Sequence, residues 1–212
     1  MLRKQWAISA LVFAASLYFL LYSSQQFFSQ RKEEPQNAAL PSAKEPGQNI
    51  ILLANKDYYP FLKQHFQNAK HRIIGTVFLI KLTSHRENEP ADLLRVLIAA
   101  AKRKVDVTLV LEISSDIKET TDANMQAAKM LLDSGIKVRF DHDHVTTHSK
   151  VFVIDDRYCF VGSHNFTHAA LAMNQELSLF VDSPGLAAEI TTFIRQIPLS
   201  SEKVASSLRP VH

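Results

Sequence analysis

Short apolar runs and longer segments of helical periodicity alternate along this chain. Runs of mostly β-branched, aliphatic or aromatic residues predict strands. They span 50–54, 72–80, 105–113, 136–140, 151–154, 158–161 and 177–181. Between several of these runs, apolar residues recur three or four positions apart, which predicts helices at 58–66, 90–104, 123–134 and 184–196. This alternation predicts an α/β sandwich in which helices flank a central mixed β-sheet.

Single residues at the ends of these segments support the helices. Asp57 is a residue type that caps helix N-termini, Pro90 suits a first turn, and Gly135 suits the position after a last turn. The aromatic stripe within 58–66 is typical of a face turned toward a core. The basic run 102–104 is interpreted as a solvated helix end, and contact with a phosphate backbone is the alternative.

Composition divides the chain into four parts. With 212 residues, of which 46% are hydrophobic and 21% charged, the chain is long enough for one well-buried domain. Residues 29–48 are polar, contain three prolines and a glycine, and are interpreted as a flexible linker. We therefore expect an N-terminal segment at 1–28, the linker, a folded domain at 49–198 and a loose tail at 199–212.

The N-terminal segment contains an apolar run, 6–22, that follows Arg3 and Lys4. The run is just long enough for a membrane helix, and the bulky residues at its end favour an uncleaved anchor over a cleaved signal peptide. A buried core helix is a third interpretation. The basic residues before the run predict a cytoplasmic N-terminus and a domain outside the cytoplasm, periplasmic in a bacterium. Secretion after cleavage is the alternative.

The segment 148–176 gathers side chains suited to phosphate chemistry. Because residues two apart on a strand share a face, we expect His148 and Lys150 to project together. The same holds for Ser163 and Asn165 at the end of the next strand. An imidazole can act as nucleophile or general acid, while an ammonium and an amide donate to the oxygens of a phosphodiester. The sequence therefore predicts a phosphate site where these strands meet.

Two acidic residues in the same segment are expected to have different roles. Glu176 precedes the apolar run 177–181 and would accept the proton on the second ring nitrogen of His148, which fixes the tautomer. Asp155 has the strand parity opposite to that of His148, so we expect it to be structural, at the turn.

The complete spacing resembles the HKD signature of the phospholipase D superfamily, HxKx4Dx6GSxN. Its positions are occupied by His148, Lys150, Asp155, Gly162, Ser163 and Asn165. Asp156 departs from the pattern, because many relatives have glycine there. The resemblance implies a phospholipase D-like sandwich over most of the chain after the linker. Bacterial exported endonucleases with one motif are more similar than the Zucchini-type mitochondrial proteins, because a single cysteine, Cys159, cannot form their zinc insertion.

The resemblance also implies a mechanism. His148 would attack phosphorus and form a covalent phosphohistidine, and Glu176 would orient it. Lys150, Ser163 and Asn165 would hold the phosphate oxygens, without a metal or a cofactor. A second histidine of the same kind would protonate the leaving oxygen. The family's mechanism therefore implies a homodimer, because the chain contains one HxK sequence only.

The net charge of the predicted domain does not identify the substrate. Residues 49–212 contain 19 Lys and Arg against 18 Asp and Glu, a formal charge of +1, which permits nucleic acid as a substrate without requiring it. An endonuclease acting on DNA or RNA is the first hypothesis. A phospholipase D acting on phospholipid headgroups at the membrane is the second, and a non-catalytic membrane-tethered scaffold is the third.

Several histidines remain ambiguous. The run 141–144, Asp-His-Asp-His, is similar in composition to a metal site, but its spacing indicates no fourth ligand, so a polar loop beside the substrate is favoured. His164 and His168 lie beside Asn165 and could extend the phosphate site, although no spacing rule requires it. Cys159 lies within a predicted strand and is expected to be a small core residue.

Overall fold

The structure of the protein is a computed structural model that describes residues 50–83, 88–114, 116–142 and 144–200. The predicted anchor at 6–22, the linker at 29–48 and the tail beyond Ser200 lie outside the described residues, and their assignments stay predictions. Among the helices that are described, none is both long enough and apolar enough to cross a bilayer.

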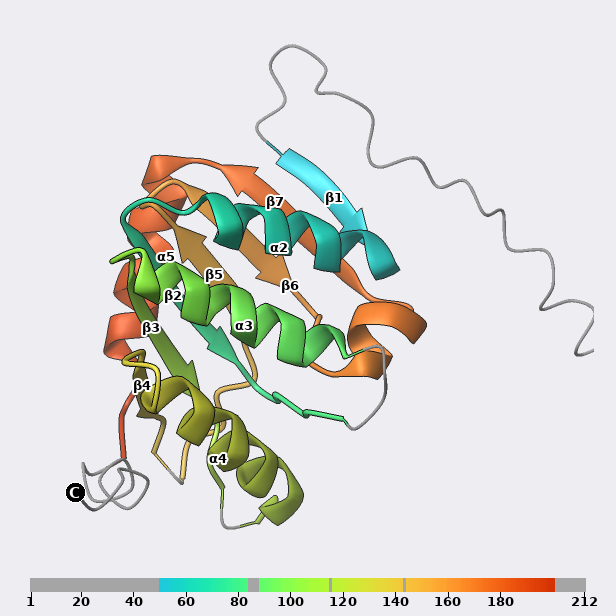
Figure 1. Ribbon diagram of the computed structural model, residues 1–212, viewed down its shortest axis with the longest axis vertical. Coiled ribbons are helices and arrows are strands. Elements are labelled where there is room, and N and C mark those ends of the chain that lie inside the picture. Colours follow the sequence, from blue (N-terminus) through green and yellow to red (C-terminus); the bar gives the residue numbers. More distant parts are fainter. Residues whose placement is uncertain (1–49, 84–87, 115, 143, 201–212) are drawn as a thin grey trace, which may run out of the picture. The chain divides into compact units, whose positions relative to one another are not determined.

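A seven-stranded mixed sheet forms the centre of the fold, in the order β1-β7-β6-β5-β2-β3-β4 (Figure 1). The strands are β1 (Ile50–Ala54), β2 (Arg72–Val77), β3 (Asp106–Leu111), β4 (Lys137–Phe140), β5 (Lys150–Ile154), β6 (Tyr158–Gly162) and β7 (Leu177–Asp182). The pairs β2–β3 and β3–β4 are parallel, and all other neighbours are antiparallel. The predicted mixed sheet is therefore confirmed.

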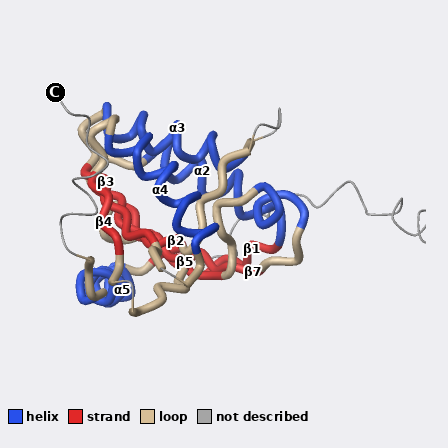
Figure 2. The backbone as a smooth tube through the Cα atoms, turned by 90° about the horizontal axis from the view of Figure 1, so that it is seen from below, coloured by secondary structure: helices blue, strands red, loops and turns tan. Residues whose placement is uncertain are grey.

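Helices cover both faces of the sheet, as Figure 2 shows. One face carries α2 (Tyr58–Asn68), α3 (Glu89–Lys102) and α4 (Lys118–Leu132), and the other carries α5 (Pro184–Gln196). Two single turns, η1 (Asn55–Asp57) and η2 (Ala169–Met173), complete the described elements. The α/β sandwich is thus the one that the periodicity predicts.

Apolar side chains divide into two cores according to the face they occupy. The larger core joins the sheet to α2, α3 and α4, and includes Leu53, Leu62, Phe66, Leu97, Phe152 and Phe160. The smaller core lies beneath α5 and includes Ile74, Val153, Cys159 and Ile194. Cys159 is fully buried, which raises the pKa of its thiol to about 11, so it is the core residue expected from the sequence.

Several predicted boundaries need correction. The strand predicted at 72–80 ends at Val77, and Ile80 makes only an isolated bridge to Phe166. The helix predicted at 123–134 starts earlier, at Lys118. Asp57 makes no side-chain cap, because a short 3-10 turn leads directly into α2. The ordered chain also continues past 198, since the amide of Ser200 donates to Phe140.

Other helix ends follow the sequence signals. The Asn88 side chain caps α3 by accepting from the Ala91 amide at 3.1 Å, and Pro90 lies in the first turn. Gly135 follows α4 with a φ of +79°, a conformation that favours glycine. Within the basic run, Arg103 donates to the carbonyls of Phe66 and Ala69, so this residue closes the C-terminal end of α2.

Candidate active site

The motif residues meet at one end of three adjacent strands. In the antiparallel register, Lys150 at the start of β5 pairs with Gly162 at the end of β6, and Gly162 pairs with Ser178 near the start of β7. A Cβ at position 162 would lie 1.9 Å from the Ser178 hydroxyl oxygen, so the close approach of these strands requires glycine. His148 precedes this row, while Ser163, Asn165 and Glu176 lie in the connection from β6 to β7.

Lys150 is buried, with only 5% of its surface exposed. Its ammonium donates to the His148 carbonyl oxygen at 2.6 Å and lies 4.8 Å from the centre of the Phe78 ring. Burial lowers the pKa of this lysine to about 8, although the carboxylates of Glu176 and Glu112 oppose the shift. A cation in a poorly solvated position is well suited to stabilise charge that develops on a phosphate.

His148 is exposed, and its ring packs 4.6 Å from the Phe78 ring, measured between centroids. Partial burial and the neighbouring Lys150 charge both lower the pKa of its imidazole below the usual value of 6.5. The ring is therefore mostly neutral at pH 7 and carries a free lone pair. An exposed neutral imidazole beside a buried ammonium is the pairing that nucleophilic attack on a phosphodiester needs.

A buried acidic pair holds the backbone that carries His148. The Thr147 amide donates to Glu112 Oε2 at 2.6 Å and to Asp141 Oδ2 at 2.9 Å. On the other side, the Thr76 hydroxyl donates to the Ser149 carbonyl oxygen at 3.2 Å. Burial, together with Asp141, raises the pKa of Glu112 to about 8, so Glu112 retains its proton at neutral pH. The pair thus binds the loop without placing two negative charges in the interior.

The Glu176 carboxylate accepts hydrogen bonds from the Ser163 hydroxyl and from Asn174 Nδ2, the latter at 3.1 Å. Its backbone amide donates to Asn55 Oδ1 at 2.9 Å. No hydrogen bond joins it to His148 in the described part of a single chain, which differs from the contact expected from the sequence. Glu176 nevertheless lies close enough to favour the charged form of Lys150.

Two asparagines fix the bend that follows β2 and supports the Phe78 ring. Asn165 Oδ1 accepts from the Leu79 amide at 3.2 Å. Asn124, fully buried on α4, accepts from the Ile80 amide and donates to the Phe78 carbonyl oxygen, both at 2.8 Å. These bonds replace ladder pairing after Val77, which explains why the strand ends earlier than its apolar run. Sequence reasoning missed Asn124, although it occupies a polar position in the apolar stripe of its helix.

Asp155 lies at the opposite end of β5 from His148. Its carboxylate accepts from the backbone amides of Lys70, His71 and Arg72, the shortest bond being 2.7 Å to His71. These bonds lower the pKa of Asp155 against the effect of burial. Asp155 and Asp156 both have positive φ angles, 52° and 54°. The motif aspartate thus ties the β5–β6 turn to the start of β2.

The ambiguous histidines separate into different environments. His164 is fully buried, stacks on Tyr58 at 4.2 Å between ring centroids, and bonds through its two nitrogens to the Ser178 hydroxyl and the Asn55 carbonyl oxygen. His168 Nδ1 lies 2.7 Å from Glu89. His164 therefore belongs to the core, and in this chain it does not extend the phosphate site.

In the run 141–144, Asp141 is buried and accepts from the amides of Ile113 and Thr147, whereas the rings of His142 and His144 lie 5.3 Å apart. Asp143 lies outside the described residues. Three or more His, Cys, Asp or Glu side chains do not converge as metal ligands anywhere in the ranges that the structure describes. Asp141 is a structural residue here, although the sequence placed it in a substrate-side loop.

Comparisons with known proteins place the chain in a family. Residues 62–197 match the family model described as "Cardiolipin synthase, PLD-like domain". A cardiolipin synthase of Staphylococcus aureus is 35% identical over 104 residues, which are 49% of this chain and 21% of that protein. Cardiolipin synthase A of Yersinia pseudotuberculosis is 25% identical over 156 residues, 74% of this chain and 32% of that protein. The chain thus spans a third or less of these relatives' length.

Solved structures show the same fold. Nuc from Salmonella typhimurium, a phospholipase D family member, superposes with a TM-score of 0.59 and 24% identity, over 70% of this chain and 93% of Nuc. NucT from Helicobacter pylori superposes with a TM-score of 0.56 and 18% identity, over 70% of this chain and 94% of NucT. The family match covers well over half of the residues, and the sheet and the motif agree with it. The chain belongs to the phospholipase D superfamily, in the PLD-like domain family named after cardiolipin synthase.

Proposed function

We propose that this protein is a metal-independent phosphodiesterase that cleaves nucleic acid through a phosphohistidine. The observation that carries the proposal is the exposed, neutral imidazole of His148 beside the buried ammonium of Lys150. The first group supplies a nucleophile, and the second stabilises the charge that forms on the phosphoryl oxygens.

The proposed reaction has two displacements. A ring nitrogen of His148 attacks phosphorus, a P–N bond forms, and the P–O bond to the leaving group breaks. A second histidine, which must be in its protonated imidazolium form, donates a proton to the leaving oxygen and becomes neutral. That histidine then removes a proton from water, whose oxygen attacks phosphorus and breaks the P–N bond. Lys150, Asn165 and Ser163 hold the non-bridging oxygens in both steps.

A second copy of the chain supplies the second histidine. The sequence contains one HxK motif, so the two histidines come from two protomers related by a two-fold axis. An exposed apolar face supports this arrangement. It lies on β1, β6 and β7, on the side of the sheet that carries α5, and consists of Ile50, Leu52, Val161, Leu177 and Leu179. This apolar face borders the active site, because Leu177 follows Glu176 directly.

Nucleic acid is the proposed substrate class for two reasons. The single HKD motif resembles that of bacterial exported endonucleases, and the described fold spans nearly the whole of Nuc and NucT. Phospholipid headgroup transfer or hydrolysis is the second candidate. It is favoured by the 35% identity to a cardiolipin synthase, which exceeds the identity to either solved structure.

Cleavage assays separate these candidates. In EDTA, the 212-residue chain is expected to cut single-stranded DNA, RNA or duplex DNA and to leave phosphatidylglycerol vesicles unchanged. Products are measured by gel electrophoresis for nucleic acid and by thin-layer chromatography for lipid. Headgroup release without nucleic-acid cleavage would transfer the assignment to phospholipids. Inactivity on all four substrates would contradict the proposed phosphodiesterase.

Anion binding at the active site is expected to weaken as the pH rises through 8. Lys150, whose pKa is about 8, loses its charge there, while sulfate keeps the same charge throughout. Sulfate inhibition of bis(p-nitrophenyl) phosphate hydrolysis should therefore show an inhibition constant about tenfold higher at pH 9 than at pH 7. Circular dichroism at each pH serves as the control for folding. An inhibition constant that stays level over this range would contradict the assigned role of Lys150.

A further inference from the structure

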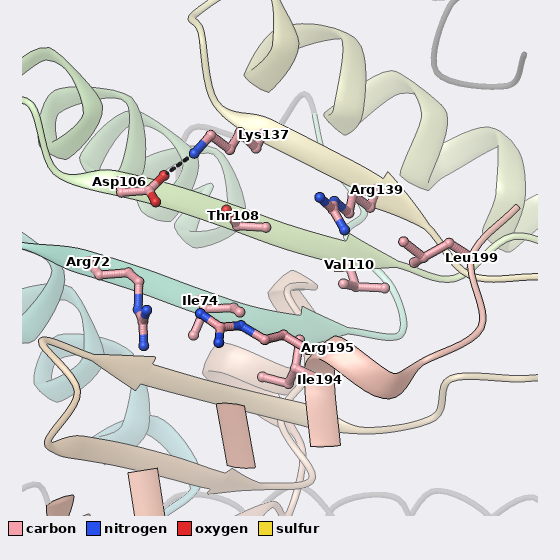
Figure 3. A pocket seen from close by; sticks show the side chains of 10 residues that line it. All are labelled: Arg72, Ile74, Asp106, Thr108, Val110, Lys137, Arg139, Ile194, Arg195 and Leu199. Carbon is pink, nitrogen blue, oxygen red and sulfur yellow. Dashed lines mark hydrogen bonds and ion pairs between the residues drawn. The ribbon is translucent and has the colours of Figure 1, made fainter. Parts of the chain in front are cut away.

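A cationic cavity lies on the sheet face that carries α5, apart from the active site. It has a volume of about 200 Å³, and none of the motif residues lines it (Figure 3). Its walls come from β2, β3, β4 and from α5 with the residues after it. The side chains that line it are Arg72, Ile74, Asp106, Thr108, Val110, Lys137, Arg139, Ile194, Arg195 and Leu199. The cavity is therefore separate from the active site in its residues.

Two of the four cationic side chains that line the cavity are paired with a carboxylate in the described structure, and two are not. Lys137 pairs with Asp106 at 2.8 Å, and a terminal nitrogen of Arg72 pairs with Asp156. Arg139 and Arg195 form no hydrogen bond or ion pair with any residue that the structure describes. Figure 3 shows both guanidinium groups extending over β2 and β3. Two uncompensated guanidinium groups that share one cavity create a strongly attractive position for an anion.

A buried donor in the same cavity lacks a partner. Arg72 Nε is inaccessible to solvent and makes no hydrogen bond within the described structure. A buried N–H group without an acceptor is destabilising, and more so when it is charged. The charged guanidinium of Arg72 thus lies at the edge of the cavity with one donor unsatisfied, and it adds to the positive charge there.

We propose that this cavity binds a small phosphate monoester. The planar guanidinium forks of Arg139 and Arg195 suit phosphate oxygens, with the Thr108 hydroxyl as a further donor. The floor is apolar, formed by Ile74, Val110 and Ile194, and accommodates the carbon part of the ligand. A volume of about 200 Å³ holds a phosphate with a few carbon atoms, which excludes a long polymer segment within the cavity.

The test uses arginine side-chain NMR on the 212-residue chain labelled with ¹⁵N-arginine. The Nε–H resonance of Arg72 should shift and saturate as sn-glycerol 3-phosphate is added. The double variant Arg139→Gln/Arg195→Gln should bind at least about tenfold more weakly. Arg95→Gln, which removes one positive charge from an exposed position on α3, should change the affinity less than twofold.

Two further titrations define the ligand. Inorganic phosphate is expected to bind more weakly than glycerol 3-phosphate, because it leaves the apolar floor uncovered, and equal affinity would overturn the assignment to a monoester. Glycerol should produce no shift. Binding by the His148→Asn variant should equal that of the unmodified chain, so the cavity is tested independently of catalysis. A resonance that does not move, or an equal loss of affinity in Arg95→Gln, would overturn the proposal.

If the double glutamine variant does not fold, Arg139→Lys/Arg195→Lys replaces it. This variant keeps both charges and loses the planar forks, so several-fold weaker binding is expected. Unchanged affinity in the folded lysine variant would contradict recognition by guanidinium forks and would likewise overturn the proposal.

Discussion

Replacement of His148 by asparagine is expected to lower kcat on any phosphodiester substrate by about 10,000-fold or more. The substitution removes the nucleophile from one protomer and the proton donor from the other, so both displacements fail. Asparagine keeps a polar side chain of similar reach at an exposed position. His148 is exposed, makes no side-chain hydrogen bond in the described structure and packs its ring on Phe78, so the fold should be preserved.

Single-turnover assays and thermal melts make the comparison decisive. His71→Asn is the matched control, because His71 is exposed directly before β2, beside Asp155 and at the opposite end of β5 from His148. It should retain activity within about twofold, since it lies outside the active site. Both variants should melt within a few degrees of the unmodified chain. A folded His148→Asn variant that keeps one tenth of the activity would exclude the phosphohistidine mechanism.

Local periodicity was sufficient to predict most of the fold and part of the site. The two-residue period of a strand predicted that His148 and Lys150 belong together, and the register of β5 with β6 brings Gly162 beside them. Helix α5 begins and ends where its apolar spacing and Pro184 indicated. These features depend on residues that are close in the sequence, so the pattern of residues was sufficient to predict them.

Local periodicity could not predict contacts between segments that are distant in the sequence. The sequence pattern placed Glu112 inside a predicted strand and gave it no role. In the structure, Glu112 and Asp141 both accept a hydrogen bond from the Thr147 amide, because the pairing of β3 with β4 brings residues 112 and 141 together. Asn124 lies on a helix more than forty positions away in the sequence, and it accepts a hydrogen bond from the Ile80 amide just after the end of β2. In the single chain, the Glu176 carboxylate accepts a hydrogen bond from the Ser163 hydroxyl rather than from His148, so its role in orienting His148 stays a prediction. The hydrogen-bond partners of these side chains are determined by the tertiary structure and cannot be read from the sequence pattern.

Placing a charge on the apolar face is expected to remove both association and activity. Leu179 lies at the centre of that face, between Leu52 on β1 and Val161 on β6, and is 39% exposed. Burial of a leucine against a second copy contributes about 1.5–3 kcal/mol, and a buried unpaired carboxylate costs more than this gain. Leu179→Glu should therefore yield a folded monomer whose kcat is at least about 100-fold lower, because no second histidine reaches the phosphate.

Light scattering after size-exclusion chromatography measures the association, and the same samples are assayed for turnover. Phe193→Glu is the control, since Phe193 is an apolar residue on α5 that is 53% exposed and lies outside the apolar face. That variant should remain dimeric and active. A monomeric Leu179→Glu variant with full activity would show that one histidine is sufficient and would contradict the shared site.

Subunit exchange distinguishes a shared site from two independent sites within a dimer. When equal amounts of unmodified and His148→Asn chains are mixed and allowed to exchange, about one quarter of the dimers contain two intact histidines. If both histidines act on one phosphate, the mixture should retain about a quarter of the activity of unmodified dimers at the same total concentration. Independent sites would retain about one half, because every intact chain would then work alone. A value near one half would therefore refute the proposed pairing of two His148 side chains, even if the protein is a dimer.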